Sequence, residues 1–170
     1  MRRVVALAVA GALSLPAAVH AQAWDAAKGV VGKATTRTLE GQINRRLLEE
    51  SRKNQCSFVT DSDQLAPGCD AKVRRLANAL IDAKKKINSA GVENFKFVVL
   101  GHTDSRGSAA HNKELSAKRA AVIERELIRK GIPKDDIESV GMGSERRLVK
   151  PDDTPAKQAK NRRYELQVRL

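Results

Sequence analysis

The sequence has few aromatic residues for a chain with so much positive charge. Aromatic residues make up 3% of its 170 residues, whereas 32 lysines and arginines against 20 aspartates and glutamates give a formal net charge of +12. Proteins that hold single-stranded nucleic acid combine a basic groove with aromatic side chains on which the bases stack. Here the basic residues are scattered, apart from Lys84-Lys85-Lys86, and lack interleaved aromatics. The composition therefore argues against a nucleic-acid partner, and most of these charges are expected to form a solvated surface.

The sequence also lacks an apolar run long enough to cross a bilayer. The first candidate, residues 4–15, stops short of the roughly 20 residues that a membrane-spanning helix needs. It follows Arg2 and Arg3 and precedes small residues, which is the pattern of a secretory signal peptide covering residues 1–21. We expect cleavage after Ala21 or Ala23 and export of the rest. For an exported basic chain, an anionic cell-envelope polymer is the favoured class of partner.

Cysteine is scarce, with only Cys56 and Cys69 present. Both lie far downstream of the apolar run, so no cysteine directly after that run could accept a lipid. In an exported chain two cysteines most simply form a disulfide. Closing a loop of this length would stabilise the fold by about 3 kcal/mol in the chain-entropy model. The alternative is a pair of free buried thiols.

Recognisable catalytic and metal-binding motifs are missing. No G-x-S-x-G elbow, H-x-x-x-H or C-x-x-C spacing occurs. His102, Asp104 and Ser105 fall in one short loop, whereas the members of a catalytic triad converge from separate segments. His102, Asp104 and His111 are the only clustered candidates for metal ligands, and no cysteine lies near them. The sequence therefore predicts neither an enzyme nor a metal site, and it indicates no cofactor.

The periodicity of the apolar residues predicts an α/β domain preceded by a helix. Leu39, Ile43 and Leu47 recur at helical spacing, so an amphipathic helix is expected over residues 36–53, after a loose start. This helix either docks on the domain or binds a partner. The chain then follows the order β-α-β-α-β-α-β, which predicts an α+β sandwich with helices packed on a mixed sheet of about four strands. The expected strands are residues 56–60, 94–100, 137–143 and 164–170, and the expected helices are residues 69–88, 108–130 and 155–161.

A charged pair of residues marks the candidate site. Asp104 comes just past the carboxyl end of a buried strand, where open α/β sheets gather ligands. Arg119 lies in the next helix among small residues. A carboxylate and a guanidinium that line one pocket match a zwitterion, because the first takes an ammonium and the second takes a carboxylate in a bidentate pair. The alternatives are that Asp104 pairs with Arg119 directly or caps the helix.

These residues stand in a set of motifs that resembles the OmpA-like peptidoglycan-binding domain family. The motifs GHTD, N-x-x-L-S-x-x-R-A, KGIP, GMG and NRR appear in the family's order between residues 101 and 163. The resemblance covers residues 55–170, which leaves residues 22–54 as an extension that carries the amphipathic helix. The earlier segment FVTDSDQL is similar to a family motif, but Val59 and Thr60 depart from it.

The resemblance implies non-catalytic binding of peptidoglycan through the zwitterionic end of diaminopimelate, held by Asp104 and Arg119. It also implies supporting contacts from Asp61, Thr103, Asn112, Leu115 and Arg163. Such a protein would sit on the cell wall in the periplasm, at the inner side of the outer membrane, and support envelope integrity or tethering. The alternative is a periplasmic adaptor or assembly factor, in which residues 24–54 bind an envelope protein or a second copy and the domain localises it at the wall.

Overall fold

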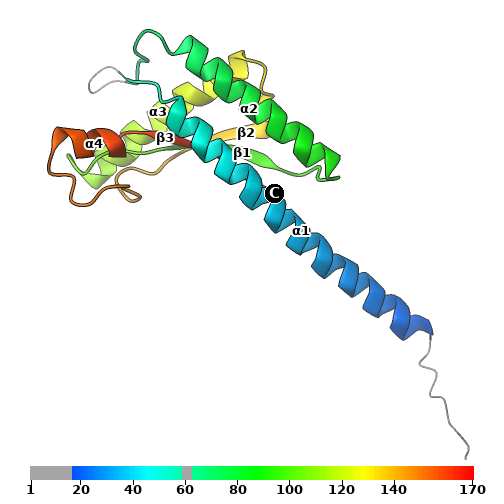
Figure 1. Cartoon of the computed structure of the whole chain (residues 1–170). Coiled ribbons are helices and arrows are strands. Elements are labelled where there is room, and N and C mark those ends of the chain that lie inside the picture. The colour runs from blue at the N-terminus through cyan, green and yellow to red at the C-terminus, as the bar shows by residue number, and fades with distance from the viewer. Residues whose placement is uncertain (1–16, 59–62) are drawn as a thin grey trace, which may run out of the picture. The chain divides into compact units, whose positions relative to one another are not determined.

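The computed structural model describes residues 17–58 and 63–170, with side chains from residue 35 onward (Figure 1). The predicted signal peptide lies largely outside this part of the chain and stays a prediction. The chain divides into two units, residues 1–35 and residues 36–170. Helix α1, Ala17–Lys53, begins in the first unit and ends in the second. The expectation of a loose start before residue 36 is wrong, because the alanine-rich segment forms helix despite its glycines, each of which costs only about 1 kcal/mol.

The second unit is built on a mixed sheet of three strands in the order β2-β1-β3. Strand β1, Lys96–Gly101, pairs in parallel with β2, Ile137–Gly141, and antiparallel with β3, Tyr164–Arg169. The mixed α/β fold is thus confirmed, with one strand fewer than expected among the described residues. The expected first strand is reduced to an isolated bridge between Phe58 and Leu65, and residues 59–62 lie outside the description.

Three helices follow α1, and the expected boundaries are close to those observed. They are α2, Asp70–Ser89, α3, Ala109–Arg129, and the short α4, Pro155–Asn161, with a single 3-10 turn at Lys134–Asp136. Ser108 caps α3 by accepting a hydrogen bond from the backbone N–H of His111, and Thr154 caps α4 in the same way. These caps fix the first turns because they satisfy backbone donors that have no partner within the helix.

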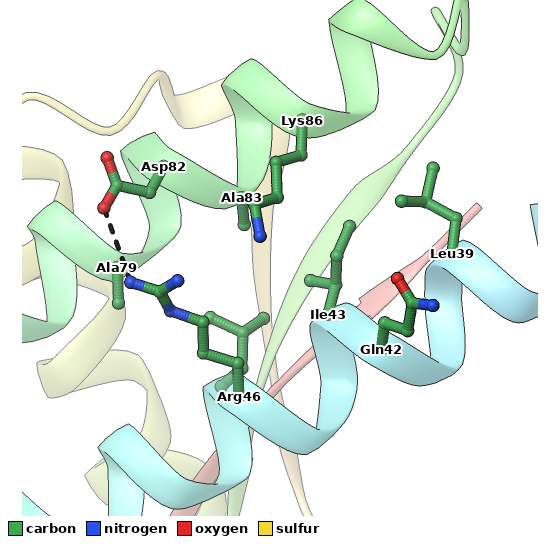
Figure 2. Close-up of a pocket in the computed structure, with 9 residues that line it drawn as sticks. Leu39, Gln42, Ile43, Arg46, Ala79, Asp82, Ala83 and Lys86 are labelled. Carbon is green, nitrogen blue, oxygen red and sulfur yellow. Dashed lines mark ion pairs between the residues drawn. The ribbon is translucent and has the colours of Figure 1, made fainter.

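The core lies between the helices and one face of the sheet. Phe97 and Val99 of β1 and Leu166 of β3 are fully buried there, as alternation along the strands predicts. Ile43 and Leu47 of α1 join the same core, so this part of α1 docks on its own domain. Figure 2 shows Ile43 facing α2 beside a small cavity of about 40 Å³, with an ion pair between Arg46 and Asp82 at 3.8 Å.

Helix α1 also covers the outer edge of β3. The side chain of Asn44 accepts from the backbone N–H of Val168 at 2.7 Å and donates to its carbonyl at 3.1 Å. Ser51 accepts from the N–H of Leu166 at 2.9 Å, and Gln55 exchanges two hydrogen bonds with the backbone of Tyr164. An open strand edge presents unpaired backbone groups. Here side chains of α1, and of Gln55 just after it, satisfy these groups along the outer edge of β3.

Two strand ends are glycines because the backbone of α3 passes directly over them. A Cβ on Gly141 would lie 2.5 Å from the nitrogen of Ala117 and 2.6 Å from the carbonyl oxygen of Lys113. A Cβ on Gly101 would lie 2.2 Å from the carbonyl oxygen of Ser116. Both glycines belong to the motifs GHTD and GMG noted above, and both set the distance between α3 and the sheet.

We predict that Gly141→Ala lowers the free energy of unfolding by about 1–3 kcal/mol, since α3 must move to admit the methyl group. Gly41→Ala is the matched control, because Gly41 lies inside α1 with no atom near its added Cβ. That change should stabilise the protein by up to about 1 kcal/mol. Denaturant unfolding of both variants measures the difference, and equal stability of the two would contradict the packing described here.

Candidate functional site

The loop that follows β1 is hydrogen-bonded on both sides, to the residue before β3 and to the loop after β2. The N–H of His102 donates to the carbonyl of Arg163 at 2.8 Å, and the N–H of Thr103 donates to the carbonyl of Gly143 at 2.9 Å. Gly101, His102, Thr103 and Asp104 are all buried. Backbone hydrogen bonding thus continues past the end of β1 and fixes the position of Asp104.

Helix α3 is tied to the same loop through Ser116. Its fully buried hydroxyl donates to the carbonyl of Lys113 at 2.9 Å and accepts from the N–H of Gly143 at 2.8 Å. Gly143 in turn accepts from Thr103. One serine of the L-S motif therefore links the helix that carries Arg119 to the loop that carries Asp104.

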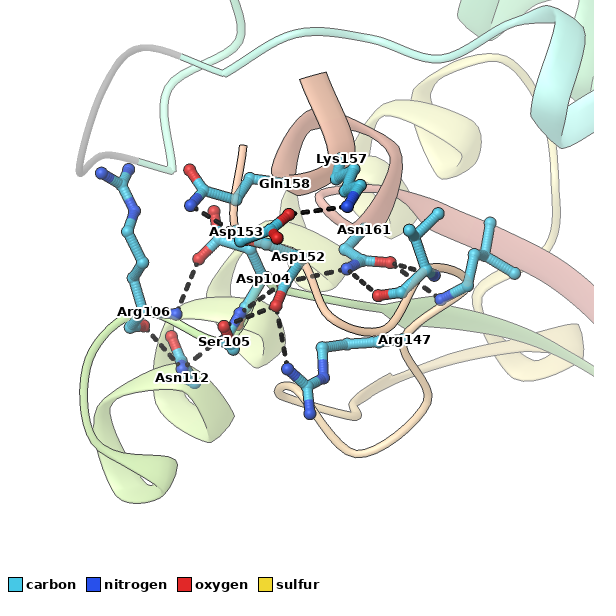
Figure 3. A network of polar contacts seen from close by, with 12 residues as sticks. Asp104, Ser105, Arg106, Asn112, Arg147, Asp152, Asp153, Lys157, Gln158 and Asn161 are labelled. Atoms are coloured by element: carbon cyan, nitrogen blue, oxygen red, sulfur yellow. Dashed lines mark hydrogen bonds and ion pairs between the residues drawn. The ribbon is translucent and has the colours of Figure 1, made fainter. Parts of the chain in front are cut away.

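The carboxylate of Asp104 is almost completely buried, with its side chain 7% exposed. Its Oδ2 accepts from the Arg162 guanidinium at 2.7 Å. Its Oδ1 accepts from the backbone N–H of Arg106 at 3.1 Å, a contact that Figure 3 shows. The ion-pair partner of Asp104 within the described chain is thus Arg162 rather than Arg119. Because Ser108 caps α3, the helix-capping alternative for Asp104 is also wrong.

Arg119 lies on α3 across the same pocket. Its guanidinium carbon is 5.1 Å from the centre of the Phe58 ring, which is a cation–π geometry. Asp104 and Arg119 both line a pocket with a volume of about 900 Å³. The structure therefore brings together the two residues on which the sequence-based hypothesis rests, and it adds Arg162 between the loop and α4.

The other predicted contact residues fall into three groups. Thr103 and Leu115 line the pocket, and the Thr103 hydroxyl is buried with no hydrogen-bond partner among the described residues. Asn112 also lines it, but its amide donates to the carbonyls of Arg106 at 2.8 Å and Asp104 at 3.4 Å, so it fixes the loop. Asp61 lies outside the described residues.

Arg163 lines the pocket, but its side chain is already hydrogen-bonded to other residues of the protein. Its guanidinium donates to Glu165 at 2.8 Å, to the Arg146 carbonyl at 3.0 Å and to the Asn161 carbonyl at 3.3 Å. Its side chain is 7% exposed, against 38% for Arg162. Of the two arginines in NRR, Arg162 is therefore the one with a guanidinium open to a ligand. The sequence held a signal for this difference, because Tyr164 was expected to point inward. Alternation along the strand then places Arg163 on the same face as Glu165, opposite to Tyr164.

A second network, which the sequence analysis missed, holds the loop of residues 143–154 against the site. Asp152 accepts hydrogen bonds from the hydroxyl and N–H of Ser105 at 2.6 and 2.9 Å, from Arg147 at 2.9 Å and from Asn161 at 2.9 Å (Figure 3). These bonds, led by that of the Ser105 hydroxyl, hold the pKa of Asp152 well below its usual range although burial acts in the opposite direction. Asp152 thus holds Ser105, the residue next to Asp104, through two hydrogen bonds.

Residues 17–58 and 63–170 contain no group of three His, Cys, Asp or Glu side chains that could hold a metal ion. Within the same residues, no helix combines the length and the apolar character needed to cross a membrane.

The site therefore belongs to a small α/β domain with a cationic pocket at the carboxyl end of its central strand. Residues 57–162 match the OmpA family, and the chain belongs to that family. It is 34% identical over 115 residues to the peptidoglycan-binding protein ArfA of Mycobacterium tuberculosis, covering 66% of this chain and 31% of ArfA. It is 43% identical over 111 residues to outer membrane porin F of Pseudomonas fluorescens, covering 65% of this chain and 31% of the porin. The chain thus spans about a third of these relatives.

Solved structures show the same fold. The peptidoglycan-associated lipoprotein from Burkholderia pseudomallei superposes with a TM-score of 0.55 at 26% identity, over 68% of this chain and 89% of that one. A periplasmic domain of MotB superposes with a TM-score of 0.54 at 22% identity, over 66% of this chain and 57% of that one. The second likeness concerns the fold alone.

The two cysteines lie close together without a bond between them, and Cys56 lines the pocket. Both are buried, and the Cys56 sulfur is 3.9 Å from the carbonyl oxygen of Cys69. Burial raises the pKa of the Cys56 thiol to about 12, so the folded protein holds it as an unreactive thiol. The disulfide stays a prediction.

We predict that protein exported to an oxidising compartment contains the Cys56–Cys69 disulfide. After denaturation without reductant, Cys56 and Cys69 should not react with an alkylating reagent. Reduction should lower the free energy of unfolding by about 3 kcal/mol. The double variant Cys56→Ser/Cys69→Ser is the control and should be insensitive to reductant. Alkylation of both cysteines before reduction would contradict the disulfide.

Proposed function

We propose that this protein binds peptidoglycan without catalysis, through the zwitterionic end of diaminopimelate in the stem peptide. Membership of the OmpA family supports this proposal, as do the names of two relatives, a peptidoglycan-binding protein and a peptidoglycan-associated lipoprotein. The single observation that carries it is the shared pocket of Asp104 and Arg119. In this proposal the protein is periplasmic and wall-associated, and it supports envelope integrity or tethering.

The ligand's ammonium would bind Asp104. An ionised carboxylate offers about four lone-pair sites, and the described partners of Asp104, Arg162 and the N–H of Arg106, occupy two of them. An ammonium can therefore join the carboxylate without breaking the Arg162 pair. The buried setting strengthens the contact, because the surrounding protein screens charge less than water does.

The ligand's carboxylate would bind Arg119. Its planar fork fits a carboxylate in a bidentate pair, which a lysine could not form. Packing over the Phe58 ring limits the orientations of the guanidinium and so reduces the entropy lost on binding. Arg162, with its side chain 38% exposed, is placed to share the carboxylate from the other side of Asp104.

The remaining contacts supply shape and orientation. The Thr103 hydroxyl lacks a partner in the described chain and would bond a polar atom of the ligand, while Leu115 gives an apolar wall. Asn112 and Arg163 would act by holding the loop and the pocket wall. Asp61 keeps the role that the family resemblance implies for it, as a prediction.

We predict that Asp104→Ala and Arg119→Ala each weaken binding to purified peptidoglycan sacculi by about ten- to a hundredfold. Each change removes one charge-assisted contact worth about 1.5–3 kcal/mol. Arg119→Lys should weaken binding nearly as much because the fork is lost. Sedimentation of protein with sacculi gives the bound fraction.

Lys118→Ala is the matched control on the same helix, since Lys118 is exposed and pairs with Glu114 on the outer face. It should bind as the unaltered protein does. Circular dichroism of each variant separates lost binding from lost folding. Unchanged binding of folded Asp104→Ala and Arg119→Ala would refute the proposal, and so would release of soluble fragments from the sacculi, which would indicate an enzyme.

A further inference from the structure

The described residues that line the pocket carry more positive charge than a zwitterion requires. The described residues that line it include six basic side chains and one acid, Asp104. The basic residues are Arg52, Arg106, Arg119, Lys160, Arg162 and Arg163. Arg162 is balanced by Asp104, and Arg163 by Glu165. A zwitterionic group is electrically neutral, so it engages Asp104 and Arg119 and leaves the other charges of the pocket unexplained.

Three of these cations, Arg52, Arg106 and Lys160, enter none of the ion pairs found among the described residues. All three are exposed at the pocket. Some basic residues outside the pocket lie one turn from an acid, as Lys53 does from Glu49, whereas others, such as Lys85, enter none of these ion pairs either.

Helix α4 gives the closest comparison. Lys157 pairs with Asp153 at 2.7 Å and does not line the pocket, whereas Lys160, three residues later, lines it. The pocket lining thus gathers three basic side chains, Arg52, Arg106 and Lys160, that enter none of the ion pairs among the described residues. Like charges gathered in a cleft repel one another and raise the local concentration of anions.

Two of the three cations adjoin the zwitterion site. Arg106 donates its backbone N–H to Asp104, while Figure 3 shows its side chain extending away from the Asp152 network. Lys160 lies two residues before Arg162, the ion-pair partner of Asp104. A ligand anchored on Asp104 and Arg119 would therefore present its neighbouring groups to Arg106 and Lys160.

We propose that Arg106 and Lys160 form a second subsite for a free carboxylate of the same ligand, next to the zwitterion site. This inference rests on the proposed function and narrows it. The pocket selects the acidic form of the stem peptide, in which the residue that precedes diaminopimelate keeps its α-carboxylate, over the amidated form. Arg52, on the last turn of α1, adds to the attractive field at the pocket mouth.

Calorimetric titration of the full exported chain with two synthetic tripeptides tests this proposal. Both consist of alanine, γ-linked glutamate and diaminopimelate, and they differ only in whether the glutamate α-carboxylate is free or amidated. The free acid should bind about five- to tenfold more tightly at low salt, and the ratio should shrink as salt is added. In Arg106→Gln/Lys160→Gln the ratio should fall close to one.

Lys157→Gln is the matched control and should keep the ratio of the unaltered protein. Equal affinity of the unaltered protein for both tripeptides would overturn the second subsite, and so would an undiminished ratio in the double variant. Titration with free diaminopimelate distinguishes failure of the second subsite from failure of the proposed function. Binding of diaminopimelate together with equal tripeptide affinities removes only the second subsite, whereas failure of all three ligands to bind removes the proposed function as well.

Discussion

The structure depends on one constraint, which is that the buried carboxylate of Asp104 must be met by donors. A carboxylate that is removed from water without partners is strongly unfavourable. Arg162 and the N–H of Arg106 supply two hydrogen bonds, and the rest of the site keeps these donors in place. Asp152 fastens the next residue, Ser105, and Asn161 holds Asp152, so the loop after β1 and the entry to β3 are joined by a continuous polar network.

Close backbone packing gives this network its precision. Gly101 and Gly141 let α3 lie against the strand ends, and Ser116 connects that helix to Thr103 through Gly143. Arg119 thus keeps a defined position relative to Asp104, although 15 residues separate them in the sequence. Helix α1 contributes from the opposite edge by satisfying the outer backbone groups of β3, the strand that follows Arg162 and Arg163. A site built on rigid elements in this way loses little entropy when a ligand binds.

The sequence predicted the parts of the fold that repeat and missed those that depend on tertiary contact. The apolar periods of α2, α3 and the later strands gave their positions within a few residues. Among the described residues the first expected strand is reduced to the bridge between Phe58 and Leu65. The side chains of Asn44, Ser51 and Gln55 cover the outer edge of β3, a role that the sequence pattern of polar residues does not reveal. Asp104 and Arg119 were found through their place at a strand end and in a small-residue helix. Arg162 was missed because both arginines precede β3, and only the contacts of Arg163 with Glu165 and two backbone carbonyls show which of the two stays open.

The central claim is that opposite charges at Asp104 and Arg119 hold both halves of one zwitterionic group. Calorimetric titration with free diaminopimelate and with two derivatives tests it most directly, one derivative with both carboxylates amidated and one with both amines acetylated. The account predicts that free diaminopimelate binds and that each derivative loses at least about tenfold in affinity, because each lacks one charge of the pair. Binding of either derivative as tightly as the free amino acid would contradict it.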